Sequence, residues 1–547
     1  MNTPFFNKSK EIANDFIQSA LFVDDEIYDS REESRHALNS QALVKAFAKA
    51  KKLCALNSPK TVEDFEDVIH VALKSDITIL DWQLNLKQNE NVDGDDEEDV
   101  DEIDPRGTYT LQLIGKLIAE DRNELKLILV YTGETGLPGI VDKIFTKFQP
   151  QGIQKISANT LGAESYRIRV AGKPSLEGTF AHTPELNSWI LRYEEIPDYL
   201  LTEFTKMTAG LVSNVALKAV SSIRSNVNKI LKIYNKDLDP AFLAHRAMLP
   251  IPDDAAELLK DSIIDSFDSI IDYSELEQYC DFGTIEKWLE SNKFDDKTIK
   301  VASKDITIQE NLRLSWLEKG FLNLMQKIWS NNYANETFPS NKISNFYREH
   351  LHKSETLEYF KPNDNVTSNI DEQFSILTHH KSNYSSPTYK PKLTLGSVVK
   401  GKVSKEYWLC IQQKCDSVRI DSENRRFLFI PLTPVTGDKN FNIVVKDIDD
   451  SKVFTKLKID IASSHNLKTI RFKANKDGAV YAEKRGKSKG YVFYPIYYKP
   501  NQKNSERYDW ILDLKDSHAQ RIANKYAATL SRVGLDEYEW LRRWGGN

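Results

Sequence analysis

The chain has 547 residues and a formal net charge of −6, with 40 % apolar and 28 % charged residues. This length exceeds what one hydrophobic core supports, so we expect roughly two to four domains. The acidic balance disfavours a dedicated nucleic-acid binder, because such proteins concentrate Lys and Arg to neutralise phosphates. No apolar run approaches the roughly 20 residues that span a bilayer, and the first residues show no signal-peptide pattern. We therefore expect a cytoplasmic protein without a membrane segment.

The first third of the chain, from residue 19 to about residue 175, alternates short apolar runs with segments of helical spacing such as 61–73 and 136–148. This alternation is typical of a doubly wound parallel sheet with helical crossovers. We predict an α/β domain over residues 1–184 with a five-stranded parallel sheet. The predicted strands are 20–23, 53–56, 77–80, 127–131 and 166–170.

An acidic segment, 88–104, interrupts this order with the sequence QNENVDGDDEEDVDEID. A run of like charge that almost lacks apolar residues stays disordered, because burial does not offset its self-repulsion. We interpret it as a surface insertion after the third strand. A calcium loop is the alternative, but the ligand register and terminal Glu of an EF-hand are absent.

The middle of the chain, 185–378, is predicted to be a mostly helical domain. Apolar residues recur there at three- to five-residue intervals, which indicates one long amphipathic helix whose apolar face is either core or a dimer seam. Pro250 and Pro252 then break the pattern, and Asp253 and Asp254 begin another helix. The apolar positions of the long helix are Phe204, Met207, Leu211, Val215, Val220, Ile223, Val227, Ile230 and Tyr234.

The remainder is predicted to be a linker at 379–392, rich in Ser, Pro and Lys, and a domain at 393–547. Aromatic and β-branched runs in this last domain predict strands in a small barrel or sandwich, followed by a terminal helix. Its cysteines, Cys410 and Cys415, lie five apart without a second pair, which favours buried structural thiols over a zinc site. With four cysteines in the whole chain, no disulfide framework is expected.

Carboxylates follow two of the predicted strands. Strand one ends in FVDDE, with Asp24 and Asp25, and strand three ends in ITILDWQ, with Asp81. Because ligands bind at the carboxyl edge of open parallel sheets, we expect these three residues to meet there. Asp24 and Asp25 supply hard oxygen ligands for Mg²⁺, and Asp81 and the backbone carbonyl of Gln83 complete the predicted ligand set. Asp81 is the candidate nucleophile for a phosphoryl group.

The next two strands end in a hydroxyl and an ammonium group. Thr132 follows ILVY, and Lys173 follows RVAG. We predict that both side chains contact phosphoryl oxygens, Lys173 as a charge-assisted donor. About forty residues separate them, more than a compact domain of this class needs, so an additional strand or hairpin is expected between them. The structural alternative is that the strand-end residues are ordinary caps, a turn hydroxyl and a solvated lysine.

Five residues at the strand ends give the sequence its resemblance to the response-regulator receiver family. In chain order they are Asp24, Asp25, Asp81, Thr132 and Lys173. The resemblance implies that Asp24 and Asp25 are the paired acidic metal residues and that Asp81 is the phosphoacceptor. It further implies that Thr132 is the switch hydroxyl and Lys173 the phosphate-contacting lysine. Mg²⁺ as cofactor, a sensor histidine kinase as partner and phosphotransfer with autodephosphorylation as the only activity follow from the same resemblance.

The whole chain is similar to the stand-alone response regulators of Detocs-type antiphage two-component systems. This similarity implies a phosphate buffer that draws the signal away from a second, effector response regulator. The competing interpretation is a phosphorylation-switched output protein that exposes a protein- or DNA-binding face. A homodimer fits either interpretation. For a separate enzyme in the C-terminal region, we find no combination of nucleophile and base.

Overall fold

The computed structural model describes residues 3–28, 38–87, 106–119, 124–381, 389–420, 424–437, 441–447, 453–459, 467–485 and 490–530. The chain divides into two compact units, Met1–Lys293 and Phe294–Asn547. The acidic segment 88–104 lies outside the described residues, and the predicted domain boundaries at 184 and 378 stay predictions. No helix in the described part of the chain is both long enough and apolar enough to cross a membrane.

A seven-stranded sheet forms the centre of the first unit, in the order β2-β1-β3-β4-β7-β6-β5. All five predicted strands are present and run parallel. Strands β5 and β6 form the additional antiparallel hairpin that the sequence predicts between Thr132 and Lys173. The bounds are β1 Ser19–Val23, β2 Leu53–Asn57, β3 Ile77–Leu80, β4 Lys126–Thr132, β5 Gln154–Ser157, β6 Thr160–Gly162 and β7 Tyr166–Gly172.

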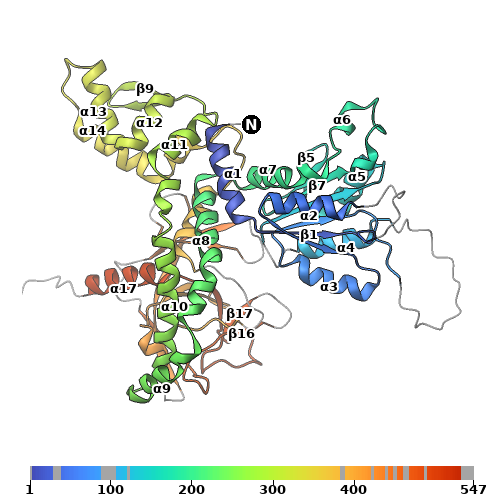
Figure 1. Ribbon diagram of the computed structural model, residues 1–547. Helices are drawn as coiled ribbons and strands as arrows, with labels where there is room; N and C mark the ends of the chain where they lie inside the picture. Colours follow the sequence, from blue (N-terminus) through green and yellow to red (C-terminus); the bar gives the residue numbers. More distant parts are fainter. Residues whose placement is uncertain are drawn as a thin grey trace, which may run out of the picture. The chain divides into compact units, whose positions relative to one another are not determined.

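Helices cover both faces of this sheet (Figure 1). Because side chains alternate along a strand, Leu21 and Val23 of β1 enter one core while Ala20 and Phe22 enter the other. Helices α3, α4 and α5 pack on the first core, and α1, α2 and α7 pack on the second. The helix bounds are α1 Pro4–Phe16, α2 Ser40–Lys49, α3 Val62–Ala72, α4 Thr108–Leu117, α5 Leu137–Phe148, α6 Pro184–Asn187 and α7 Ile196–Thr208.

The predicted long helix is two helices, so that prediction is wrong. Helix α7 ends at Thr208, and α8 (Leu211–Ile233) begins after Gly210, whose extended backbone interrupts the helical turn. Glycine is a poor helix former, and the Ser213 hydroxyl donates to the Thr208 carbonyl at 2.6 Å across the break. The apolar stripe therefore continues across a bend that its spacing alone does not indicate.

Three further helices complete the first unit: α9 (Asp239–Met248), α10 (Asp254–Asp272) and α11 (Phe282–Glu290). The predicted start of α10 is confirmed, with Asp253 at the N-cap. Helix α10 packs alongside α8 as the second arm of a helical hairpin, visible in green in Figure 1.

The second unit begins with a small helical subdomain around aromatic side chains such as Trp316, Phe321 and Trp329. It also contains a β-hairpin, β8–β9, that the prediction of a helical region did not include. The bounds are β8 Lys297–Val301, β9 Lys304–Ile308, α12 Glu310–Lys319, α13 Phe321–Asn332, α14 Ser340–Phe346, α15 Leu357–Phe360 and α16 Ile370–His379.

The rest of the second unit is a nine-stranded antiparallel sheet, in the order β13-β14-β12-β11-β10-β18-β17-β16, with β15 paired to β12. A bridge between Phe472, at the end of β15, and Pro495, just after β17, joins the two outer strands of the series β15-β12-β11-β10-β18-β17. These six strands therefore form a nearly closed ring around an aromatic core. A small barrel is therefore the arrangement observed. The bounds are β10 Ser397–Gly401, β11 Tyr407–Cys410, β12 Arg425–Val435, β13 Ile443–Lys446, β14 Phe454–Ile459, β15 Lys468–Phe472, β16 Glu483–Lys484, β17 Tyr491–Phe493 and β18 Tyr508–Asp513.

The predicted terminal helix is present as α17 (Asp516–Leu530). Of the two cysteines in this unit, Cys410 is buried in β11, and burial raises the pKa of its thiol to about 12. Cys415 is exposed. The prediction of buried structural thiols therefore applies to Cys410 and is wrong for Cys415.

Candidate functional site

Strand register brings the predicted site residues to one edge of the first sheet. Val23 of β1 pairs with Leu80 of β3, so the residues that follow them, Asp24 and Asp81, leave neighbouring strands at the same level. In the same way, Thr132 at the end of β4 pairs with Gly172 of β7, and Lys173 follows directly. Strands β3 and β4 are buried along their whole length, so these side chains leave a buried sheet at this edge.

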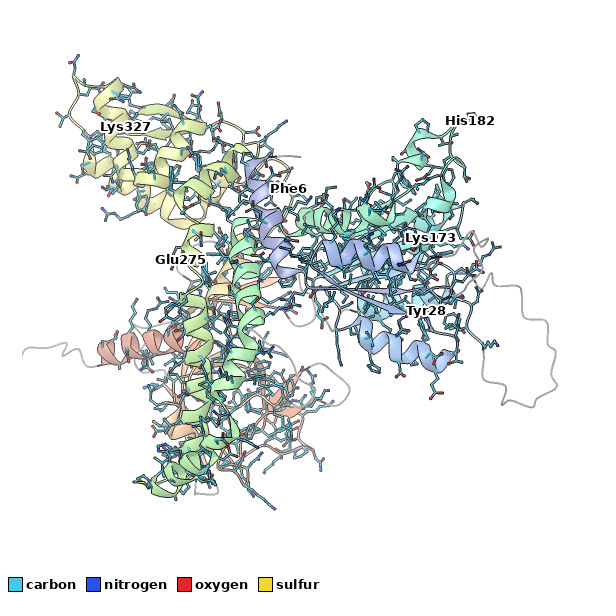
Figure 2. All side chains as sticks on the ribbon, viewed as in Figure 1. Phe6, Tyr28, Lys173, His182, Glu275 and Lys327 are labelled. Atoms are coloured by element: carbon cyan, nitrogen blue, oxygen red, sulfur yellow. The ribbon has the colours of Figure 1, made fainter. Side chains whose placement is uncertain are left out.

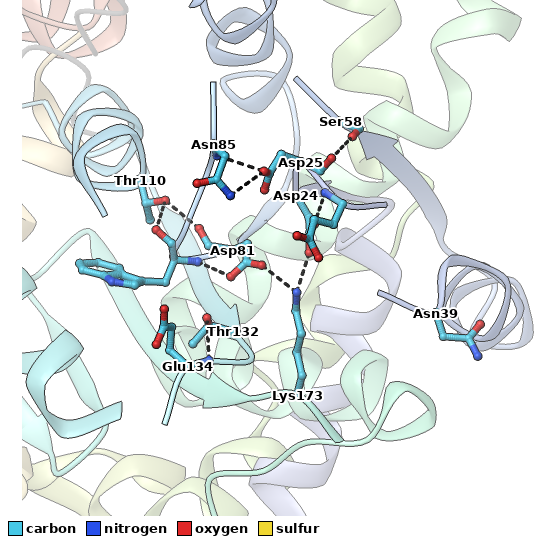
Figure 3. Close-up of polar contacts among 12 residues, drawn as sticks. Asp24, Asp25, Asn39, Ser58, Asp81, Asn85, Thr110, Thr132, Glu134 and Lys173 are labelled. Carbon is cyan, nitrogen blue, oxygen red and sulfur yellow. Dashed lines mark hydrogen bonds and ion pairs between the residues drawn. The ribbon is translucent and has the colours of Figure 1, made fainter. Parts of the chain in front are cut away.

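Lys173 joins the two strands that carry the acidic residues. Its Nζ lies 2.7 Å from Asp24 Oδ2 and 2.7 Å from Asp81 Oδ2 (Figure 3). All three side chains are almost fully buried, and Lys173 as a whole residue has no exposed surface. Figure 2 shows Lys173 among the side chains of the first unit. The solvated-lysine alternative is therefore wrong for Lys173.

Backbone amides hold the remaining carboxylate oxygens of this pair. The amide of Trp82 donates to Asp81 Oδ1 at 2.6 Å, and the amide of Glu26 donates to Asp24 Oδ1 at 2.8 Å. Buried carboxylates require such partners, because an unpaired buried charge is strongly destabilising. The two carboxylates are thus fixed in orientation and face each other across the ammonium group.

Asp25 lies beside this triad but is held by a different loop. Its Oδ2 accepts hydrogen bonds from the backbone amide of Asn85 at 3.0 Å and from Asn85 Nδ2 at 3.2 Å. Its backbone carbonyl accepts from the Ser58 hydroxyl at 2.9 Å and from the ammonium group of Lys60. Asp25 therefore ties the loops that follow β1, β2 and β3 together.

Burial and neighbouring charges shift the pKa values of Asp24, Asp25 and Lys173. Burial raises the pKa of Asp24, and the charge of Asp81 raises it further, although Lys173 lowers it. Burial also raises the pKa of Asp25. For Lys173, burial lowers the pKa, but the charges of Asp81 and Asp24 together outweigh burial, so the pKa is raised. One ammonium group against three carboxylates leaves an excess of negative charge when all four are ionised.

This excess charge and the oxygen donors fit a small divalent cation such as Mg²⁺. However, the described residues contain no cluster of three or more His, Cys, Asp or Glu side chains that converge as a metal site. Lys173 instead holds the Oδ2 atoms of Asp24 and Asp81. The ligand set of Asp24, Asp25, Asp81 and the Gln83 carbonyl therefore stays a prediction.

Thr132 is fully buried at the end of β4, and Figure 3 shows it beside Asp81. Its Oγ1 accepts a hydrogen bond of 3.3 Å from the amide of Glu134, while its carbonyl accepts from the amide of Lys173 at 2.8 Å. The hydrogen bond from the Glu134 amide is long, so the Thr132 hydroxyl is weakly held and can form a shorter hydrogen bond with a different partner.

Two residues that the sequence did not indicate support the position of Asp81. The Thr110 hydroxyl on α4 lies 2.7 Å from the Asp81 carbonyl and 3.1 Å from the Trp82 carbonyl. Gly107, which precedes α4, has φ of +90°, and a Cβ there would lie 2.2 Å from the Trp82 ring. Only glycine fits this position. The one sequence signal for this contact is a glycine before a helical segment, which is common at helix ends.

The family comparison agrees with this geometry. Residues 16–177 match the family model described as the response receiver domain. These residues form a response receiver domain. The matched segment is less than a third of the chain, and no curated protein and no solved structure matched the sequence.

A receiver domain indicates a response regulator that is controlled by phosphorylation, with a histidine kinase as the general partner of the domain. Receiver domains typically bind Mg²⁺. The structure brings three of the predicted site residues, Asp24, Asp81 and Lys173, into direct contact.

Proposed function

We propose that this protein accepts a phosphoryl group on Asp81 from a sensor histidine kinase. The observation that carries the proposal is the buried triad in which Lys173 Nζ lies 2.7 Å from both Asp24 and Asp81. A structural ion pair would need only one carboxylate for one ammonium. Here the receiver domain retains an excess of buried negative charge at a strand edge, which is costly unless it has a chemical role.

The proposed reaction is a transfer between two nucleophiles. A carboxylate oxygen of Asp81 attacks the phosphorus of the phosphohistidine, the phosphorus–nitrogen bond breaks, and the imidazole leaves. Lys173 keeps its ion pair with Asp24 and donates a hydrogen bond to the arriving phosphoryl group. The Thr132 hydroxyl donates to another phosphoryl oxygen. Mg²⁺, held by Asp24, Asp25, Asp81 and the Gln83 carbonyl, would supply positive charge that neutralises the phosphoryl oxygens.

The proposal is tested by labelling the full chain with acetyl phosphate or a phosphorylated kinase in the presence of Mg²⁺. Asp81→Asn should abolish labelling, because the amide is not a nucleophile for phosphoryl transfer. Asp64→Asn is the matched control, since Asp64 is a helix-cap carboxylate on the same domain. Labelling of Asp81→Asn at the level of the control would contradict the proposal.

The role of the phosphate is a second question. One role is buffering in an antiphage two-component system, for which the resemblance of the whole chain is the argument. The other is a switched output, which one observation favours: α8 is fixed to the receiver domain rather than loosely attached. Arg224 of α8 forms an ion pair with Asp76 at 3.0 Å, and Asn214 donates to the Ser9 hydroxyl at 2.9 Å.

The two roles predict opposite phenotypes for Asp81→Asn in cells that carry the whole system. If the protein is a buffer, basal phosphate from the kinase reaches the second, effector response regulator, and uninfected cells become sick. Disabling that effector should then restore growth. If the protein is a switched output, uninfected cells grow normally but lose the response. Normal growth without protection would therefore contradict buffering.

A further inference from the structure

The charge of the chain is divided unevenly between its carboxyl-terminal part and the rest. Residues 389–530 include the nine-stranded sheet and α17, and they contain 28 Lys and Arg but only 15 Asp and Glu, an excess of 13 positive charges. Because the whole chain carries a net charge of −6, the remaining residues carry −19. The overall acidity therefore conceals a strongly basic domain, part of which is labelled β16 and β17 in Figure 1. Such an excess of Lys and Arg on one domain is typical of proteins that bind polyanions.

Three of these cations lie together on the outer face of β12 and β15. Arg426 of β12 is directly opposite Arg471 of β15 in the antiparallel ladder. The neighbouring pair, Phe427 and Ile470, points into the aromatic core, so both arginines point outward, and both are exposed. Lys473 follows Arg471 by two residues, is exposed, and lies on the same face. We call Arg426, Arg471 and Lys473 the cationic patch.

Within the described part of the chain, no carboxylate neutralises the cationic patch. Arg426, Arg471 and Lys473 form no ion pair and no side-chain hydrogen bond there. Lys456 of β14, by contrast, is paired with Glu372 at 2.9 Å. Like charges that lie directly opposite each other destabilise a strand pair. The Arg426–Arg471 pair is therefore a cost to the fold that a bound anion relieves, and guanidinium groups match phosphate oxygens in two-point contacts.

The segment 494–498, with the sequence YPIYY, runs beside β15. Phe472 at the end of β15 forms an antiparallel bridge with Pro495, and the amide of Ile496 donates to the Arg471 carbonyl at 3.0 Å. Phe472 and Pro495 are both buried, so their neighbours in this register, Arg471 and Ile496, lie on the outer face. Ile496 is accordingly 45 % exposed. The segment 494–498 therefore borders the cationic patch.

Tyrosine rings of this segment are open to solvent next to the cations. Tyr494 and Tyr498 are partly exposed and stack with ring centroids 4.7 Å apart, and Tyr497 is 52 % exposed. The carboxylates of Glu483 and Asp509 lie near the Tyr494 hydroxyl, so this end of the surface suits an uncharged group rather than a phosphate. Exposed aromatic rings beside cations are the surfaces on which unpaired bases stack.

We infer that the outer face of β12 and β15, together with the segment 494–498, binds single-stranded nucleic acid. The cationic patch holds backbone phosphates, and the rings of Tyr494 and Tyr498 stack on unpaired bases. A duplex hides the faces of its bases, and an acidic protein segment has no bases, so either would use the cations without the rings. The combination of cations and rings selects the single strand. This site is separate from Asp81 and does not depend on phosphoryl transfer.

The test is the fluorescence anisotropy of a labelled oligothymidylate of about 20 nucleotides, titrated with the full chain at salt concentrations from about 50 to 200 mM. Each phosphate contact on a single strand contributes about −0.7 to the slope of log K against log salt, so three contacts predict about −2 and a roughly twentyfold loss of affinity over this range. Arg426→Ala/Arg471→Ala should reduce the slope to about −0.7. Lys300→Ala/Lys327→Ala is the matched control, since it removes the same charge from exposed positions outside the nine-stranded sheet and should leave the slope unchanged.

Stacking is tested separately from charge. Tyr494→Ser/Tyr498→Ser should weaken binding about tenfold and leave the salt slope unchanged, because it removes two rings and no charge. An abasic strand of the same length should bind the unaltered chain with a similar loss, and this measurement does not depend on the folding of any variant. Circular dichroism checks that the arginine and tyrosine variants retain their fold.

Several outcomes would overturn the inference. A full chain that does not bind the oligothymidylate at the lowest salt concentration would do so, as would an arginine variant whose salt slope equals that of the lysine control. Equal binding of the abasic strand would show that the rings make no contact with bases. A duplex or a poly-glutamate that displaces the oligothymidylate as well as an unlabelled single strand does would overturn the single strand as the occupant.

Discussion

Replacing Lys173 by methionine should strongly destabilise the receiver domain, because the ammonium group is the only cation in contact with two buried carboxylates among the described residues. Asp24 and Asp81 are 3 % exposed each and lie 2.7 Å from Lys173 Nζ. Removing one partner of a buried ion pair costs about 3–5 kcal/mol, since it leaves an uncompensated charge. Each factor of ten in the unfolding equilibrium corresponds to about 1.4 kcal/mol, so the loss is roughly a hundredfold to several thousandfold.

The assay is hydrogen exchange of the full chain, followed by mass spectrometry of peptides from β4, in EDTA so that no divalent cation replaces the lost charge. Strand β4 is buried along its length, so its amides exchange through opening of the whole domain. Lys155→Met is the control, since Lys155 forms an exposed ion pair with Asp142, which contributes about 0–1 kcal/mol. Adding Asp24→Asn to Lys173→Met should recover part of the loss. Equal exchange in Lys173→Met and the control would refute the buried triad.

Three further outcomes follow from the same structure. Burial raises the pKa of Asp24, so protonation of its carboxyl stabilises the folded state. This stabilisation is fully present below the unfolded pKa of 3.8 and is lost as pH rises through the folded pKa. Asp24→Asn should therefore raise the melting temperature more at pH 7 than at pH 4. Arg224→Met should release the amino-terminal half of α8, because Asp76 loses its ion pair with Arg224. We expect faster hydrogen exchange in residues 211–224, and unchanged exchange there would contradict the role of this ion pair in holding α8. Deleting 88–104 should leave labelling of Asp81 intact, and loss of a cooperative thermal transition would show that the segment is structural.

The place of the candidate site could be predicted from the sequence, because each predicted site residue lies at the end of an apolar strand or directly after one. Parallel strands bring their carboxyl ends to one edge, so the position of Asp24, Asp81, Thr132 and Lys173 needs only the strand order of the fold. The extra residues before Lys173 were also predictable as a hairpin. The family match over residues 16–177 agrees with this part of the prediction.

The contacts within the site could not be predicted in the same way. Lys173 is 149 residues from Asp24 and 92 from Asp81, so these ion pairs depend on tertiary contacts that the local sequence does not specify. Thr110 follows the acidic insertion, and nothing in its local sequence indicates that it supports the Asp81 carbonyl.

The helical region shows the limit of periodicity. The apolar spacing from Phe204 to Tyr234 is continuous, yet Gly210 divides it into two helices. The same spacing could not distinguish core from dimer seam, because both use one apolar face. In the structure, Phe204 and Leu217 lie in the core of the first unit, while Val227 is exposed.

The central claim is that Asp81 carries the phosphoryl group. The most direct measurement is reductive trapping: the full chain is treated with acetyl phosphate and Mg²⁺, then with borohydride, which converts a phosphorylated aspartate to homoserine. Peptide mass spectrometry then locates the conversion. We predict homoserine at position 81 and at no other aspartate, with none formed when acetyl phosphate is omitted. An unmodified Asp81, or homoserine at Asp24 or Asp25 instead, would contradict the assignment.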